Sequence, residues 1–434
     1  MLGQAKGRAA ILSMVLLANS WAAAACAAPL AFGGSVLPAA SAMAPDTDVV
    51  ATAPVASLRG RPLVDAGGIP NDVSRSPGRV LRVGPQRLLR KPSQAAAVAR
   101  DGDIIEIDAG VYRNDYAFWR QNNLVLRGVG GMAHLQSAGM IPNGKAIWVL
   151  DGDSVTIENI EFSGAAVRHT NGAGIRHQGG RLVLRNTFFH DNEFSILTGA
   201  LPGADIEISN SRFWNHRRPV RHSHGIYIGK VRSLELIGNH FKGTDKGHQV
   251  KSRARRNLIA YNRIEDVEGG TSSRLIDLSN CGFSVIIGNQ IHQAPTSQNL
   301  NAIGYGPEGC EGLSARHKRL YVVHNTFVNT APAGEFVRNF ADGAVVVSNN
   351  LIFGAGQNLA GPGQDEGNVR LAMARAPADR WSAIAGDAVV DAARPLAPVE
   401  GVSLVPLMEF SAPLGVRSRP VSGLPDVGAS EYVR

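Results

Sequence analysis

Short apolar runs separated by polar turns recur along most of the chain. They lie at residues 124–126, 147–150, 155–157, 182–184, 206–208, 234–237, 258–260, 285–287, 321–323 and 345–347. No helical pattern interrupts them. Short strands that repeat every twenty to thirty residues predict a stacked β-solenoid, in which each repeat forms one coil.

From the third run onward, an Asn lies two residues beyond each run. These residues are Asn159, Asn186, Asn210, Asn239, Asn262, Asn289, Asn325 and Asn349. Stacked Asn side chains can hydrogen-bond to one another and to turn backbone, and Asn tolerates the left-handed conformation that a bend needs. The intervals are 23 to 29 residues, except for one of 36 residues. That long interval predicts an insertion at residues 306–318 that loops out on one face.

A second series of strand patterns lies between the Asn turns, at residues 173–177, 194–198, 225–229, 249–253, 275–279, 302–306 and 336–340. Strand side chains alternate between the two faces, so the residue after each central apolar residue is expected to point outward. That outward column consists of Arg176, Leu197, Tyr227, Lys251, Asp277, Gly304 and Arg338. A ladder that mixes Tyr, Lys and Asp on neighbouring coils indicates a functional face.

The two ends of the stack need polar covers. A short helix at residues 93–100, with Ser93 as its N-cap, is expected to cover the first coil. Residues 355–423 lose the repeat and predict irregular C-terminal wrapping. Turn residues at 423–425 then predict a last short strand that covers the other apolar end.

The N-terminal residues predict export from the cytoplasm. Residues 1–28 combine Lys6 and Arg8 with an apolar run and small residues, which is typical of a signal peptide. Cys26 leaves a lipid anchor as an alternative, although the upstream Leu of a lipoprotein signal is missing. Residues 29–76 predict a flexible Ala/Pro-rich linker, and residues 77–434 form the remaining domain. No other apolar run reaches membrane length, so we expect a periplasmic or secreted protein without an integral membrane segment.

Composition and charge limit the chemical class of the binding partner. The 434 residues include 49 Gly and only 6% aromatic residues, which suits tight turns between short strands. The net charge of +8 favours acidic partners. An exported protein seldom meets nucleic acid, so we expect an anionic polysaccharide and a monomeric protein.

Two cysteines remain after the signal segment. Cys281 and Cys310 follow outward-facing strands on adjacent coils. In an oxidising compartment they predict a disulfide that ties the insertion to the coil below.

Several segments resemble the pectate-lyase-like superfamily. They are the repeat with its Asn turns, the opening DGDIIEIDAGVY at residues 101–112 and the closing LPDVGASEY at residues 424–432. The resemblance extends over about residues 83–433. It implies an all-β fold, namely a single-stranded right-handed parallel β-helix with a short N-terminal capping helix.

Within that superfamily, VKS at residues 250–252 is similar to the lysine motif of the alginate lyase and chondroitinase B family. The resemblance implies that Lys251 is the base of a β-elimination, assisted by an arginine on the following coil. The chain departs from the family at residues 243–249, where GTDKGHQ replaces the calcium-binding glutamates, and at Asp277, since the nearest arginine is Arg274. The HSH at residues 222–224 lacks a third ligand at a suitable spacing. We therefore expect no metal and no cofactor.

Cleaving a uronate polymer by β-elimination requires a base, an acid and neutralisation of the substrate carboxylate. Lys251 can be the base if nearby positive charge, such as Arg253 or His248, lowers its pKa. Tyr227 or His224 can be the acid, or can exchange roles with Lys251.

Further residues are candidates for substrate binding. Arg221, Arg274 and Arg338 can hold carboxylates in bidentate fashion, and Arg253 adds positive charge. Asp277 can orient Lys251 or bind a sugar hydroxyl. The same residues also have structural interpretations, since the histidines can satisfy turn backbone and Asp277 can form a salt bridge to Lys251.

These observations predict a polysaccharide lyase. Two other functions remain open, a non-catalytic carbohydrate-binding or cell-envelope protein on the same fold, and a polyuronate C5-epimerase that reprotonates instead of eliminating.

Overall fold

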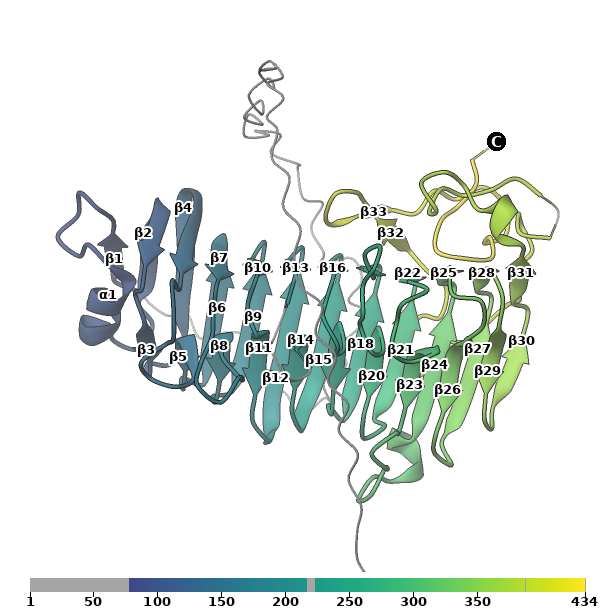
Figure 1. Cartoon of the computed structure of the whole chain (residues 1–434), viewed down its shortest axis with the longest axis horizontal. Helices are drawn as coiled ribbons and strands as arrows, with labels where there is room; N and C mark the ends of the chain where they lie inside the picture. The colour runs from purple at the N-terminus through teal and green to yellow at the C-terminus, as the bar shows by residue number, and fades with distance from the viewer. Residues whose placement is uncertain (1–77, 217–222, 387, 434) are drawn as a thin grey trace, which may run out of the picture. The chain divides into compact units, whose positions relative to one another are not determined.

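The computed structural model describes residues 78–216, 223–386 and 388–433, and every structural statement below concerns those residues (Figure 1). The predicted signal peptide, the predicted linker and Arg221 lie outside them.

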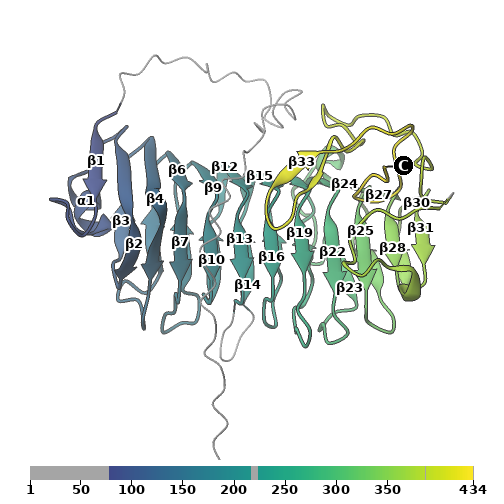
Figure 2. The same ribbon diagram turned by 90° about the horizontal axis from the view of Figure 1, so that it is seen from above.

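The strands stack in three parallel rows that wind into a β-helix (Figure 2). Row one contains β1 (Val80–Val83), β2 (Ile104–Arg113), β4 (Leu124–Gln136), β6 (Ser154–Glu158), β9 (Arg181–Arg185), β12 (Leu201–Ser209), β15 (Val231–Ile237), β18 (Arg256–Ala260), β21 (Phe283–Ile287), β24 (Arg319–Val323), β27 (Ala344–Ser348) and β30 (Gln364–Glu366). Row two continues from the end of β4 through β7 (Ile160–Ser163), β10 (Phe188–His190), β13 (Arg212–Trp214), β16 (His240–Lys242), β19 (Arg263–Glu265), β22 (Gln290–Gln293), β25 (Thr326–Asn329), β28 (Leu351–Phe353) and β31 (Val369–Leu371).

Row three contains the ten strands β3 (Ala117–Trp119), β5 (Ala146–Leu150), β8 (Ala173–His177), β11 (Phe194–Thr198), β14 (His224–Ile228), β17 (Val250–Ser252), β20 (Ile276–Leu278), β23 (Asn301–Tyr305), β26 (Glu335–Asn339) and β29 (Gln357–Ala360). The predicted fold class is confirmed, since the described chain is a parallel β-solenoid of about ten turns with one short α-helix. One assignment was wrong. Residues 147–150 were grouped with the first series of apolar runs, whose other members lie in row one, but they belong to β5 in row three.

Side chains at equivalent positions of successive coils stack on one another and form the core. The inward column of row three is fully buried and in register; it consists of Ile175, Ile196, Ile226, Val250, Ile276, Ile303 and Val337. In row two, Phe162, Phe189, Phe213 and Phe241 stack with ring centroids 4.5 to 5.3 Å apart. Burial of apolar area along these columns is the main source of stability.

The Asn residues form two neighbouring columns rather than the single column that we predicted. Asn159, Asn186, Asn210 and Asn349 take the left-handed conformation, with φ between 48° and 57°. One position later in the coil, a ladder runs through Asn239, Asn262, Asn289, Asn325, Asn350 and Asn368, all of them buried except the half-buried Asn368. The bend and the ladder therefore use adjacent positions, and Asn349 serves the bend while Asn350 serves the ladder.

The capping helix α1 (Pro92–Val98) covers the first coil, with Ala95 and Ala96 packed into the main core. Lys91 is its N-cap residue, so the predicted N-cap at Ser93 is wrong. The proline ring suits the first helical position, which moves the start of the helix upstream. The Ser93 hydroxyl instead donates to Asp115 on the next coil.

The C-terminal segment corrects two expectations. The repeat continues for one more coil, through β29, β30 and β31, before it ends. The hairpin of β32 (Met408–Phe410) and β33 (Val416–Ser418) then lies on the outer side of the stack, where Leu404 and Met408 pack with Phe283. No strand forms in residues 424–433. Hydrogen bonds such as that from Ala429 to Thr326 on β25 hold this stretch against row two.

Among the helices of the described chain, none has the length and apolar character that crossing a membrane requires.

The ladder can be tested at Asn289. Its side-chain oxygen accepts from the backbone and side chain of Asn262, and its amide donates to the Ile259 carbonyl and to Asn325. Asn289→Ala leaves buried groups unpaired, so we expect the free energy of unfolding to fall by about 2–4 kcal/mol in chemical denaturation. The control Asn186→Gly keeps the left-handed bend and is expected to cost less than about 1 kcal/mol. Equal losses for the two variants would contradict a separate structural role for the ladder.

Candidate functional site

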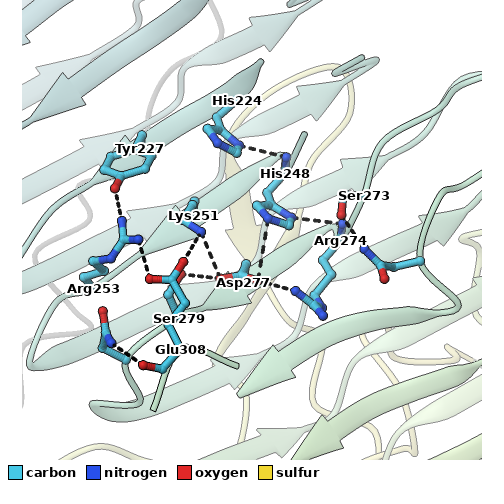
Figure 3. Close-up of polar contacts among 12 residues, drawn as sticks. His224, Tyr227, His248, Lys251, Arg253, Ser273, Arg274, Asp277, Ser279 and Glu308 are labelled. Carbon is cyan, nitrogen blue, oxygen red and sulfur yellow. Dashed lines mark hydrogen bonds and ion pairs between the residues drawn. The ribbon is translucent and has the colours of Figure 1, made fainter. Parts of the chain in front are cut away.

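The outward column of row three has the register that the sequence predicts. Tyr227 pairs with Lys251, Lys251 with Asp277, and Asp277 with Gly304. Leu197 precedes this series and Arg338 follows it. Figure 3 shows that the polar side chains of four successive coils meet on this face.

Lys251 lies at the centre of the site, with its side chain only 10% exposed. Its Nζ is 2.7 Å from Glu308 Oε1 and 3.8 Å from Asp277 Oδ1. The nearest charged groups are therefore two carboxylates, whereas the sequence had led us to expect cations. An ammonium group so placed is well paired, which allows it to be buried.

Asp277 is the buried anchor of the network. It accepts a hydrogen bond of 2.7 Å from Arg274 and another from Ser279, and His248 Nε2 lies 3.6 Å away. Burial alone would raise the pKa of Asp277, but His248, Lys251 and the other donors outweigh it and hold the pKa below its usual value. Asp277 is therefore ionised at neutral pH and can orient Lys251.

His224 and His248 each connect two neighbouring coils through a hydrogen bond to the backbone. His224 Nδ1 accepts the backbone N–H of His248 at 2.9 Å, and His248 Nδ1 accepts the backbone N–H of Arg274 at 3.0 Å. Their rings stack with centroids 5.1 Å apart. Accepting at Nδ1 leaves the proton of a neutral imidazole on Nε2, so His248 directs an N–H toward Asp277. Burial is the main reason why the pKa of His248 is lowered to about 4.

Tyr227 and Arg253 flank Lys251 on one side. Arg253 donates to the Tyr227 hydroxyl and also pairs with Glu308. The same guanidinium lies 4.8 Å from the centroid of the Tyr227 ring. The Tyr227 oxygen is thus held beside a fixed positive charge, on the coil next to Lys251.

Two arginines lie on the other side of the site. Arg274 and Arg338 are 5.0 and 5.1 Å from the ring centroid of Phe340, which is exposed. Arg338 also pairs with Glu335 at 3.0 Å. Of the predicted carboxylate-binding residues, Arg274 therefore joins the central network and Arg338 lies at its edge.

The insertion supplies a residue that the sequence analysis missed. Cys281 and Cys310 form a disulfide, with Cα atoms 5.4 Å apart. Near this link, Glu308 donates its backbone N–H to Ser279, and Asn280 donates to the Glu308 carbonyl. The Glu308 carboxylate is thereby held over Lys251 and Arg253. The interval of 36 residues signalled an insertion, but not which of its side chains would reach the site.

The lowered pKa of His248 predicts a pH effect on stability. The unfolded residue gains a proton near pH 6.5, whereas the folded residue gains one near pH 4. Its contribution to stability is therefore complete above pH 6.5 and is lost as the pH falls toward 4, by up to about 3 kcal/mol. In His248→Asn, the Asn oxygen can still accept from Arg274. We expect denaturation midpoints of this variant to fall less steeply between pH 6.5 and 4, and parallel curves would contradict the assignment.

Comparison with known proteins supports the fold. Among curated proteins, no match was found. The structure is similar to the crystal structure of pectate lyase Pel9A, with a TM-score of 0.53, 14% identity, and coverage of 82% of this chain and 97% of that chain. Such low identity shows a shared fold alone. The structure of Geobacillus virus E2 ORF18 matches with a TM-score of 0.37 and 16% identity, over 62% of this chain and 53% of that chain. This match is too distant to support an inference.

A comparison of the sequence with known protein families gives a match over the centre of the chain. The finer resemblance to the alginate lyase and chondroitinase B family is not among these matches and stays a prediction. The family described as "Right handed beta helix region" matches residues 136–365, more than half of the chain. The chain belongs to this family.

Proposed function

We propose that this protein is a polysaccharide lyase that cleaves a uronate-containing polymer by β-elimination on the outer face of row three. The observation that carries the proposal is the position of Glu308. A side-chain carboxylate from a surface insertion, 40% exposed, pairs with the buried Lys251 and with Arg253. The site is therefore built to hold a carboxylate that can be exchanged for another.

The first step is the exchange of carboxylates. Burial alone would raise the pKa of Glu308, but hydrogen bonds from Lys251 and Arg253 lower it below its usual value. Those two cations therefore stabilise negative charge at this place. When a uronate carboxylate displaces Glu308, Arg253 neutralises the uronate and makes its C5 proton more acidic.

The second step is proton abstraction. With Glu308 displaced, Lys251 loses its nearest carboxylate partner and keeps only Asp277, 3.8 Å away. An ammonium group with fewer carboxylate partners gives up its proton more readily. Lys251 releases its ammonium proton to water, and the neutral amine then takes the C5 proton, while Arg253 faces the negative charge that develops on the enolate.

The third step is departure of the leaving group. Tyr227, one coil from Lys251 and hydrogen-bonded by Arg253, protonates O4 as the C4–O4 bond breaks and the C4–C5 double bond forms. The guanidinium stabilises the resulting phenolate. The Lys251 ammonium returns its proton to Tyr227 through water, which resets both groups. His248 and His224 act as positioning residues, because their Nδ1 atoms hold backbone amides of this face.

Apolar surface beside the charges fits the sugar rings. On row three, Val149, Phe194 and Leu197 are buried, and the apolar surface before the ionic network is the face of the half-buried Tyr227, which packs against them. Phe340 lies beyond it, between Arg274 and Arg338. A uronate polymer presents both apolar ring faces and carboxylates, and this face supplies partners for both.

The proposal includes an extracytoplasmic location, periplasmic or secreted, and an anionic polysaccharide as the partner. The Cys281–Cys310 disulfide supports this location, since such bonds persist in oxidising compartments.

The lyase proposal predicts an unsaturated product. Wild-type protein is expected to raise the ultraviolet absorbance of at least one polymer among alginate, pectate, chondroitin, hyaluronan and bacterial exopolysaccharides. Lys251→Ala is expected to lower this rate by at least about 100-fold, in the range typical of acid–base catalysis. Lys242→Ala, at a half-buried lysine on row two, is the matched control and is expected to keep wild-type activity. No absorbance change on any polymer would contradict lyase activity, and binding without a product would favour a binding protein or an epimerase.

Carboxylate exchange predicts a specific effect of Glu308→Gln. This change removes the competing charge, so we expect KM for the polymer to fall about 3–10-fold, which corresponds to about 1 kcal/mol. Glu311→Gln on the same insertion is exposed and serves as the control for net charge. A rise in KM in Glu308→Gln would show instead that Glu308 itself binds substrate, and would overturn the exchange step.

A further inference from the structure

A second cluster of reactive side chains lies on row two, apart from the proposed lyase face. His134 on β4, Glu161 on β7 and His190 on β10 come from three successive coils. Their possible ligand atoms all lie within 4.8 Å of one another. His134 Nδ1 is 3.4 Å and His190 Nε2 is 2.9 Å from the same oxygen, Glu161 Oε1.

The spacing and chemistry of the cluster suit a transition metal. Four ligands around Zn²⁺ at about 2.0–2.1 Å are separated by about 3.3 Å from one another. The distances to Glu161 are near this value before any ion is added. Two imidazoles and one carboxylate are a ligand set that Zn²⁺ accepts, with one coordination position left open. The side chains of His134, Glu161 and His190 are 17 to 22% exposed, so an ion can reach them.

The outer nitrogens of both histidines have partners that would orient them as ligands. His134 Nε2 is 2.7 Å from the Ser163 hydroxyl, and His190 Nδ1 is 2.6 Å from Asp191 Oδ2. Metal-bound histidines usually donate their other ring N–H to such an acceptor, which fixes the tautomer and ring direction. Here both inner nitrogens are directed toward Glu161.

A similar set further along row two shows what is special about this cluster. His240 and Glu265 are 2.8 Å apart, and His292 pairs with Glu265 in register. The two nitrogens of His292 are, however, engaged by the Asp266 carbonyl and the Thr330 hydroxyl. Three ligands therefore converge at His134, Glu161 and His190 but not at this second set.

We propose that His134, Glu161 and His190 form a binding site for one divalent transition metal ion, with Zn²⁺ as the best fit and one coordination position facing solvent. The site is independent of the proposed lyase chemistry. It is formed by three coils, so a bound ion would also link those coils.

The test measures zinc binding to the full-length chain after removal of metals with a chelator. Isothermal titration with Zn²⁺ alone is expected to show one site that His134→Ala or His190→Ala weakens at least about tenfold. His240→Ala is the matched control, because it removes a histidine from the same row, and it is expected to bind as wild type does. Circular dichroism confirms that each variant is folded.

Substitute variants and a second metal allow the proposal to be tested even if an alanine variant does not fold. If either alanine variant does not fold, His134→Gln and His190→Asn replace it, since they keep a polar side chain on the outer face. Co²⁺ is expected to give visible ligand-field absorption in wild type that is lost in Glu161→Gln. The proposal is overturned if wild type binds no Zn²⁺, or if the His134 and His190 variants bind it as tightly as wild type.

Discussion

The structure depends on one constraint, which is that successive coils stack in parallel and in register about 4.8 Å apart. Each side chain then faces the equivalent side chain of the next coil. Inward columns must be apolar and similar in size, as in the Phe stack of row two. Polar columns must be able to hydrogen-bond to themselves, as the Asn ladder does. Charged columns must alternate in sign, because like charges directly opposite destabilise a sheet.

The candidate site follows from the same rule. Lys251 and Asp277 are opposite each other, and Arg274 lies beside Asp277. The charge balance of the site is three cations, Lys251, Arg253 and Arg274, against two carboxylates, Asp277 and Glu308. Replacing Glu308 with a substrate carboxylate preserves that balance, so the network need not rearrange when an anionic polymer binds. On row two, the same stacking brings two histidines and a glutamate together.

The sequence predicts those features that depend on the alternation of side chains along a strand. The outward column from Tyr227 to Asp277 follows from strand alternation alone. The short strands of row two were not separated from the turns, because three or four residues after an Asn carry too little pattern. Glu308 and the C-terminal hairpin could not be placed, since contacts made by an insertion or by an aperiodic segment leave no repeat in the sequence. The two Asn columns were merged because the same residue type suits a left-handed bend and a ladder.

The most direct test of the central claim is a crystal structure of the Lys251→Ala variant with an oligosaccharide of the polymer that the protein binds most tightly. The account predicts a uronate carboxylate hydrogen-bonded to Arg253, with Glu308 displaced and the Tyr227 hydroxyl near the glycosidic oxygen. An oligosaccharide bound on another face, with the pairing of Glu308 and Arg253 intact, would contradict it.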